Sequence, residues 1–211
     1  MGNRAAQEGE GQTLTMSSRP FNKVDELAHA LSEHLPTEKT CVMAVDGFDG
    51  AGKSALAREL AKRFGGKHFE LDLYVRKNHG GHYIDYLRYE DLRRDLITLQ
   101  QSRGRVICDG ICVQAVLDRL GIAGQPWIYV RQVIAGGHWS EGNFLEKYST
   151  PEEAIAGETA PVKKLAQWTG ERRPPDGQWL PGLKRELIEY HYRYRPHVQA
   201  NFVFDREASS G

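Results

Sequence analysis

The chain has 211 residues, with 28 basic and 28 acidic side chains and therefore a formal net charge of zero. This balance disfavours broad electrostatic binding to nucleic acid, and no apolar run approaches the roughly 20 residues that cross a membrane. The length fits one α/β domain with a small lid or tail.

The N-terminal stretch is polar and Gly-rich, so residues 1–19 are expected to form a disordered tail before a domain at residues 20–211. This stretch lacks the apolar segment of a secretory signal. Cys41, Cys108 and Cys112 fall in or beside apolar runs, which predicts buried free thiols in a reducing cytosol. We therefore expect a cytoplasmic protein.

Apolar periodicity predicts helices that alternate with strands. The alternation favours an α/β fold with a mostly parallel sheet, helices on both faces and right-handed crossovers. Between 136 and 181 the chain is rich in Gly, Pro, Trp and charge, and its weak periodicity predicts an irregular, lid-like segment. The expected elements in chain order are a helix at 21–35, a strand at 41–45, a helix at 54–64, a strand at 67–74, a helix at 89–104, a strand at 105–111, a helix at 113–121, a strand at 126–132, a helix at 183–196 and a strand at 200–205.

The stretch "GFDGAGKS" between the first strand and its helix has the spacing of a phosphate loop. Glycines let the backbone turn with its N–H groups inward, and the following helix offers a positive N-terminus to an anion. Lys53 is expected to reach the β- and γ-phosphates, and the Ser54 hydroxyl to bind Mg²⁺. The alternative is a Gly-rich turn that matches by chance. The predicted nucleotide-binding residues are Gly47, Asp49, Gly50, Ala51, Gly52, Lys53, Ser54 and Ala55.

Three acids could work with this loop. Asp72 closes the second strand and is predicted, with Lys53, to be catalytic, because a carboxylate there could take or orient the proton of an attacking hydroxyl; the alternative is an Asp that caps the next turn. Asp109 ends "VICD" like a Walker B strand and is a predicted metal ligand with Ser54. Asp49 either points outward to a sugar hydroxyl of the acceptor or braces the loop, and the sequence leaves both open.

The segment at 76–92 is dense in His, Tyr and Arg and could stack a base and bind a ribose. Basic residues at 131, 163, 164, 172 and 173 could supply the positive charge that phosphoryl transfer needs. For each, an ordinary solvated position is the alternative. The predicted acceptor-binding residues are Asp49, Tyr74, Arg76, Tyr83, Asp85 and Arg131.

The sequence resembles the uridine kinase-like branch of the P-loop nucleoside and nucleotide kinases. The resemblance covers about 40–134 and 183–205, through "VDGFDGAGKSALA", "LDLY", "YEDLRRDL" leading to "RVICDGI", and "YHYRYRPHVQANFVF". It implies a P-loop NTPase fold, and ATP and Mg²⁺ at Gly50, Gly52, Lys53 and Ser54. It also implies that Asp72 activates a hydroxyl, that Asp109 stands where the family usually has Glu, and that a nucleoside lies near 83–86.

Two features depart from that family. The arginine-rich lid motif is replaced by "RQVIAGGHWSEGNF", and the Asp-His-Pro cluster after the second strand is missing. The sequence therefore predicts an ATP- and Mg²⁺-dependent phosphotransferase that acts on a hydroxyl of a nucleoside or similar small molecule. The alternative is a nucleotide-binding regulatory or scaffold protein with a degenerate kinase site. The expected partner is a small-molecule acceptor, with neither nucleic acid nor membrane, and a homodimer is an allowed assembly.

Overall fold

The computed structural model describes residues 19–35, 41–77, 82–102, 104–134, 137–139, 141–171, 174, 178–180 and 182–207. The expected N-terminal tail lies, apart from Arg19, outside these residues. The three cysteines are free and buried, as predicted. Within these ranges, no helix is both long enough and apolar enough to cross a lipid bilayer.

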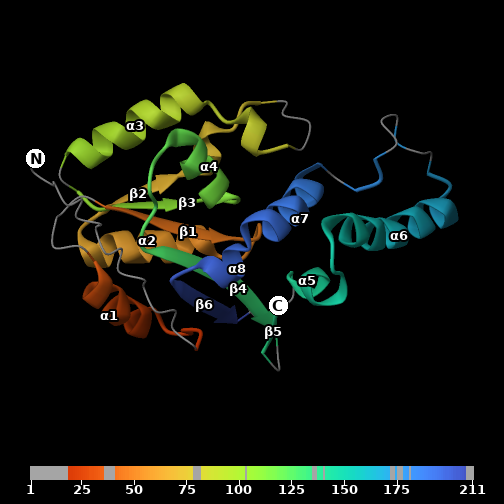
Figure 1. Cartoon of the computed structure of the whole chain (residues 1–211), viewed down its shortest axis with the longest axis horizontal. Helices are drawn as coiled ribbons and strands as arrows, with labels where there is room; N and C mark the ends of the chain where they lie inside the picture. The colour runs from red at the N-terminus through yellow and green to blue at the C-terminus, as the bar shows by residue number, and fades with distance from the viewer. Residues whose placement is uncertain are drawn as a thin grey trace, which may run out of the picture.

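A central sheet organises the fold (Figure 1), and its strands are β1 (Val42–Gly47), β2 (Lys67–Glu70), β3 (Val106–Asp109), β4 (Trp127–Ile134), β5 (His138–Trp139) and β6 (Phe202–Glu207). Strands β2, β3, β1, β4 and β6 lie side by side and are parallel. The short strand β5 pairs antiparallel with β4. The prediction of a mostly parallel sheet is confirmed.

Helices cover both faces of the sheet (Figure 1). Alternate residues of β1 explain this arrangement: Val42 and Ala44 pack into one core cluster with α3 and α4, and Met43 and Val45 into another with α1 and α2. The helices are α1 (Val24–His34), α2 (Lys53–Phe64), α3 (Tyr89–Gln101), α4 (Val113–Leu120), α5 (Asn143–Lys147), α6 (Pro151–Thr169), α7 (Gly182–Tyr194) and α8 (Pro196–Gln199), with 3₁₀ turns at Leu71–Tyr74 and Ile84–Tyr86.

The expectation of an irregular segment at 136–181 is wrong for much of its length. It contains α5 and the 19-residue helix α6, which projects from the layered body (Figure 1). The hydroxyl of Thr150 accepts the N–H of Glu153 and caps the start of α6. Only Ala154 and Ala166 of α6 are buried, so the helix shows little of the apolar periodicity on which a sequence prediction depends.

Two smaller corrections concern the ends of elements. The strand expected at 67–74 stops at Glu70 and continues as a 3₁₀ turn, which redirects the chain at Asp72. The helix expected at 183–196 ends at Tyr194, because Arg195 adopts a left-handed conformation with φ 47° and Pro196 begins α8.

Candidate functional site

The predicted phosphate loop connects the end of β1 to the start of α2. Gly50 and Gly52 have φ values of 76° and 90°, which side chains rarely adopt. Gly47 lies so close to β4 that a Cβ there would be 2.5 Å from the Val130 carbonyl oxygen. Its N–H donates to the Asp46 carboxylate at 2.7 Å, so Gly47 has a structural task in addition to the nucleotide contact predicted from the sequence.

Lys53 folds back over the loop. It is buried, and its Nζ donates to the Phe48 carbonyl oxygen at 2.5 Å. Burial lowers the pKa of Lys53 below its ordinary value, while nearby carboxylates oppose the shift. The carboxylates that interact with its charge are those of Asp46, Asp72, Asp49 and Asp109.

Ser54 and Asp109, the two predicted metal ligands, are in direct contact, and their binding of a metal stays a prediction. The Ser54 hydroxyl donates to one oxygen of the Asp109 carboxylate at 2.5 Å, and the ring of His68, from β2, contacts the other oxygen. Asp109 is almost completely buried. A hydroxyl and a carboxylate are the oxygen donors that Mg²⁺ takes alongside substrate phosphates, so the residues present fit this ion. In the described part of the chain, no group of three or more His, Cys, Asp or Glu side chains could hold a metal ion by itself.

Asp72 lies on the 3₁₀ turn after β2. Its carboxylate is exposed and accepts a hydrogen bond from the Tyr83 hydroxyl at 2.7 Å. Burial, and then the Asp72 charge, raise the pKa of Tyr83 well above its usual value, so this phenol stays a donor. The Asp72 charge also acts on Lys53, and the catalytic role of both residues stays a prediction.

The position of Tyr83 is fixed from two sides. The backbone N–H groups of Tyr83 and Ile84 donate to the two carboxylate oxygens of Glu186, on α7, at 2.7 and 2.8 Å. A Cβ on Gly110 would lie 3.0 Å from the Tyr83 hydroxyl, so the glycine after Asp109 makes room for this contact. Glu186 could not be identified from local spacing, because its partners are more than 100 positions away in the chain.

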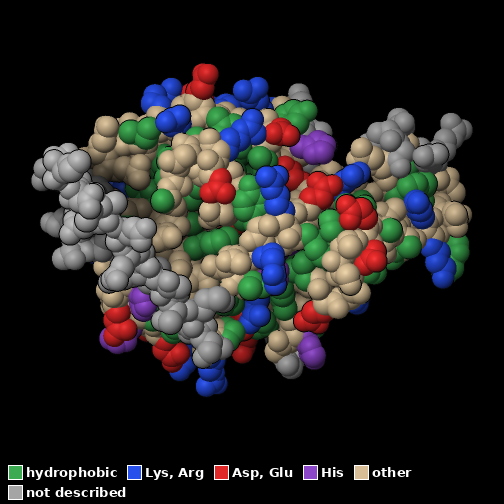
Figure 2. Space-filling model, in the orientation of Figure 1, with side chains coloured by type: hydrophobic (Ala, Val, Ile, Leu, Met, Phe, Trp, Pro, Cys, Tyr) green, Lys and Arg blue, Asp and Glu red, His purple; other side chains and the backbone are tan. Residues whose placement is uncertain are grey.

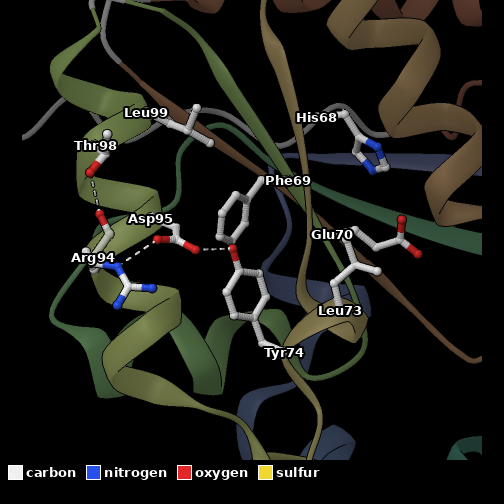
Figure 3. Close-up of a pocket in the computed structure, with 9 residues that line it drawn as sticks. All are labelled: His68, Phe69, Glu70, Leu73, Tyr74, Arg94, Asp95, Thr98 and Leu99. Atoms are coloured by element: carbon white, nitrogen blue, oxygen red, sulfur yellow. Dashed lines mark hydrogen bonds and ion pairs between the residues drawn. The ribbon is translucent and has the colours of Figure 1, made fainter.

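Four predicted acceptor-binding residues are engaged by residues outside the loop. The Tyr74 hydroxyl donates to Asp95, at 2.9 Å, in a cavity of about 400 Å³ against α3 (Figure 3). Arg76 and Asp85 line a separate cavity of about 610 Å³ beside the start of α3, where Asp85 pairs with Arg119 at 2.9 Å.

The fourth, Arg131, is held by Asp205 of β6 through two hydrogen bonds, at 2.6 and 2.8 Å. The lysines expected to assist, at 163 and 164, lie exposed on α6, and the arginines at 172 and 173 lie outside the described residues. The structure thus brings Asp49 and Tyr83 to the loop region, and places Tyr74, Arg76, Asp85 and Arg131 in other surroundings.

Two contacts to the loop region have no counterpart in the sequence prediction. Asp46 is fully buried and accepts a hydrogen bond from the Tyr190 hydroxyl; burial raises the pKa of Asp46 to about 6, although the bonds from Tyr190 and Gly47 lower it. Arg206, near the end of β6, covers Gly52, where an added Cβ would meet its Nη1 at 1.7 Å. Of these two contacts, only the one at Asp46 could have been suspected from the sequence, because an acid there directly precedes the loop.

A further cavity, of about 330 Å³, adjoins the loop at Phe48 and Asp49 and is also lined by residues of α5, α6 and α7. Phe48 is fixed by the His191 ring, which stacks on it with centroids 4.2 Å apart. A carbonyl can only accept, so His191 Nδ1 donates to the Leu187 oxygen at 2.7 Å and Nε2 accepts from the Tyr129 hydroxyl at 2.6 Å. Burial lowers the pKa of His191 to about 3, which keeps the ring neutral.

Comparisons with known proteins relate this chain to others by fold. No protein-family model matches the sequence, and no curated protein matches it. Among solved structures, this chain is similar to a possible uridine kinase from Bacillus stearothermophilus, with a TM-score of 0.50 and 14% sequence identity. The match covers 86% of this chain and 97% of the other. Because the identity is so low, the likeness shows a distant, kinase-like α/β fold, and the family implied by the sequence motifs stays a prediction.

Proposed function

We propose that the protein is an ATP- and Mg²⁺-dependent phosphotransferase that acts on a hydroxyl group of a small molecule. The observation that carries this proposal is the hydrogen bond between Ser54, at the start of α2, and Asp109, at the end of β3. It unites a loop of phosphate-binding sequence with a strand-end carboxylate, and Lys53 lies within the fields of both Asp109 and Asp72. The kinase-like fold shared with the possible uridine kinase supports the proposal.

Each residue has a definite task in this reaction. The loop N–H groups and Lys53 bind the phosphates, with Lys53 releasing the Phe48 carbonyl to do so. Ser54 and Asp109 would hold Mg²⁺, which would supply positive charge to neutralise the transferring phosphates. Asp72, oriented by Tyr83, accepts the proton of the acceptor hydroxyl. The hydroxyl oxygen forms a bond to the γ-phosphorus, the bond from that phosphorus to the bridging oxygen breaks, and ADP leaves.

The nucleoside character of the acceptor is the finer part of the proposal. It is supported by the resemblance of the motifs to uridine kinase-like enzymes and by a neighbour described as a possible uridine kinase. A panel of nucleosides, vitamins and sugars incubated with γ-labelled ATP would identify the acceptor. Transfer to at least one panel member is expected.

The decisive variant is Lys53→Ala. We expect product formation to be lost while circular dichroism and the thermal unfolding midpoint stay near the wild-type values. Lys62→Ala is the matched control, because Lys62 lies on the exposed side of the same helix. Unchanged ATP binding and turnover in Lys53→Ala would contradict the assignment.

The second candidate is a nucleotide-binding regulatory or scaffold protein. The observation that favours it is the pairing of Arg131 with Asp205, which occupies the guanidinium of the arginine nearest the expected lid. ATP binding that persists, with no transfer to any member of the panel, would support this candidate over the enzyme.

A further inference from the structure

We propose that His68 is a positioning residue for Mg²⁺, which fixes the orientation of the Asp109 carboxylate and thereby tightens the binding of the metal with its nucleotide. This inference rests on the proposed kinase function and adds a residue to its metal site. It starts from the contact between the His68 ring and Asp109, which joins β2 to the last residue of β3.

The contact between His68 and Asp109 has a definite direction. An ionised carboxylate can only accept hydrogen bonds, so Nε2 of His68 carries a proton and donates it to Oδ1 of Asp109. The Ser54 hydroxyl donates to the other oxygen, Oδ2, at 2.5 Å. Rotation of the carboxylate is therefore opposed at both oxygens, and each oxygen keeps a lone pair for a further partner.

Burial makes the second donor important. The side chain of Asp109 is 1% exposed and that of His68 is 18% exposed. Within the described ranges, Ser54 and His68 are the donors to this carboxylate. Ser54 is itself a proposed metal ligand, so His68 is the donor that holds Asp109 from outside the metal site. Without His68, a buried carboxylate oxygen would lose its hydrogen bond, which is costly.

The register of the sheet explains why His68 reaches Asp109. Strands β2 and β3 are parallel, with His68 opposite Ile107 and Glu70 opposite Asp109. Since side chains alternate along a strand, His68 lies on the same face as Asp109, two residues back along the pair. Ile107 packs in the core cluster with α2, so this is the face that α2 covers. Figure 3 shows the rings of His68 and Phe69 on opposite sides of β2.

The affinity for the metal has to come from such local contacts. Acidic and basic side chains are interspersed on the face shown in Figure 2, and the formal net charge of the chain is zero. A long-range field that draws cations to the loop is therefore weak. Groups that hydrogen-bond to metal ligands typically change metal affinity by about 10- to 100-fold, and we expect an effect in this range for His68.

The test measures how strongly Mg²⁺ tightens the binding of a non-hydrolysable ATP analogue. Calorimetry in Mg²⁺ and in EDTA gives two dissociation constants, and the ratio of the EDTA value to the Mg²⁺ value isolates the effect of the metal. His68→Met fills the space of the ring without a donor, so this ratio should fall by about tenfold or more. The dissociation constant in EDTA should stay near the wild-type value.

Two further variants separate the hydrogen bond from packing. His68→Gln offers an amide N–H in place of the ring N–H and should recover most of the ratio. His29→Met is the control, because the His29 ring lies exposed on α1, where it pairs with Glu33. A wild-type ratio in His68→Met, or a loss in His68→Gln as large as in His68→Met, would overturn the inference and leave the kinase function intact.

A measurement on the wild-type protein covers the case in which His68→Met does not fold. Nitrogen-15 spectra of the imidazole rings, with the analogue bound, should show His68 protonated at Nε2. Adding Mg²⁺ to that complex should shift the His68 signals and leave those of His29 in place. A ring protonated at Nδ1 alone, or His68 signals that ignore Mg²⁺, would refute the role of His68. Should Mg²⁺ fail to tighten binding of the analogue to wild type, the proposed function itself would fail.

Discussion

Asp46 shows how one buried side chain couples the site to folding. Its pKa is raised by burial from 3.8 to about 6, so the folded state holds the proton more tightly than the unfolded chain. The stability contribution of this group is therefore highest at acid pH and declines as pH rises from about 4 through about 6. At neutral pH, the loss amounts to roughly 3 kcal/mol.

Asp46→Asn should abolish this loss of stability at neutral pH, because an amide does not ionise. Between about pH 4 and pH 7, the free energy of unfolding of the variant should rise by roughly 3 kcal/mol relative to wild type. Urea unfolding at several pH values measures the difference. Asp118→Asn, at an exposed position of α4, should follow the wild-type curve. Parallel curves for Asp46→Asn and wild type would show that burial does not shift this carboxyl as described.

Single site residues could be predicted from the sequence where their role follows from a motif of nearby residues. Ser54 and Asp109 could be singled out from the sequence, because a phosphate-loop motif and an acid at the end of an apolar strand can each be recognised within a few residues. His68, Glu186 and Arg206 could not, since each acts on a residue far away in the chain, and their own neighbours in sequence carry no motif.

Helix α6 is the element in which sequence and structure differ most. Pro161 sits in its middle and Gly157 precedes it by one turn, and both residue types argue against a helix. Tyr148 explains the glycine, because a Cβ on Gly157 would lie 2.0 Å from the tyrosine hydroxyl. The strands and the other long helices could be predicted because each buries a regular face against the sheet, whereas α6 lies largely outside the core.

Pro161→Ala should stabilise α6. The proline is exposed, so its replacement loses little packing, and alanine restores a backbone N–H donor and removes the clash of the ring. The gain is up to about 3 kcal/mol in the free energy of local opening. Hydrogen exchange of amides in 151–169 should slow, whereas Pro151→Ala, at the first turn where proline is tolerated, should change exchange little. Equal exchange in both variants would refute this account.

Across the whole molecule, the parallel sheet gathers the functional candidates at one edge. The ends of β1 and β3, and the turn after β2, bring Lys53, Asp109 and Asp72 together. This convergence could be predicted, because alternating strands and helices imply that the strands all point the same way. The contacts that α7 makes with this edge could not be predicted, because they depend on the path of the chain between α6 and α7.

Glu186→Ala should disturb both stability and the site. It removes two charge-assisted hydrogen bonds from the backbone of Tyr83 and Ile84, and the free energy of unfolding should fall by about 2–4 kcal/mol. The segment that carries Tyr83 should exchange its amides faster, and turnover with the identified acceptor should drop with it. Glu189→Ala, which breaks only an exposed pair with Arg185, should have a small effect. Stability and exchange at wild-type levels in Glu186→Ala would contradict the role of this contact.

Helix α7 has one more consequence. Glu186 accepts a hydrogen bond from the backbone of Tyr83. One helical turn later, the Tyr190 hydroxyl donates to Asp46, just before the loop. A rigid displacement of this helix strains both attachments at the same instant. Under the proposed function, a displacement of α7 would therefore shift the partner of Asp72 and the residue before the phosphate loop together.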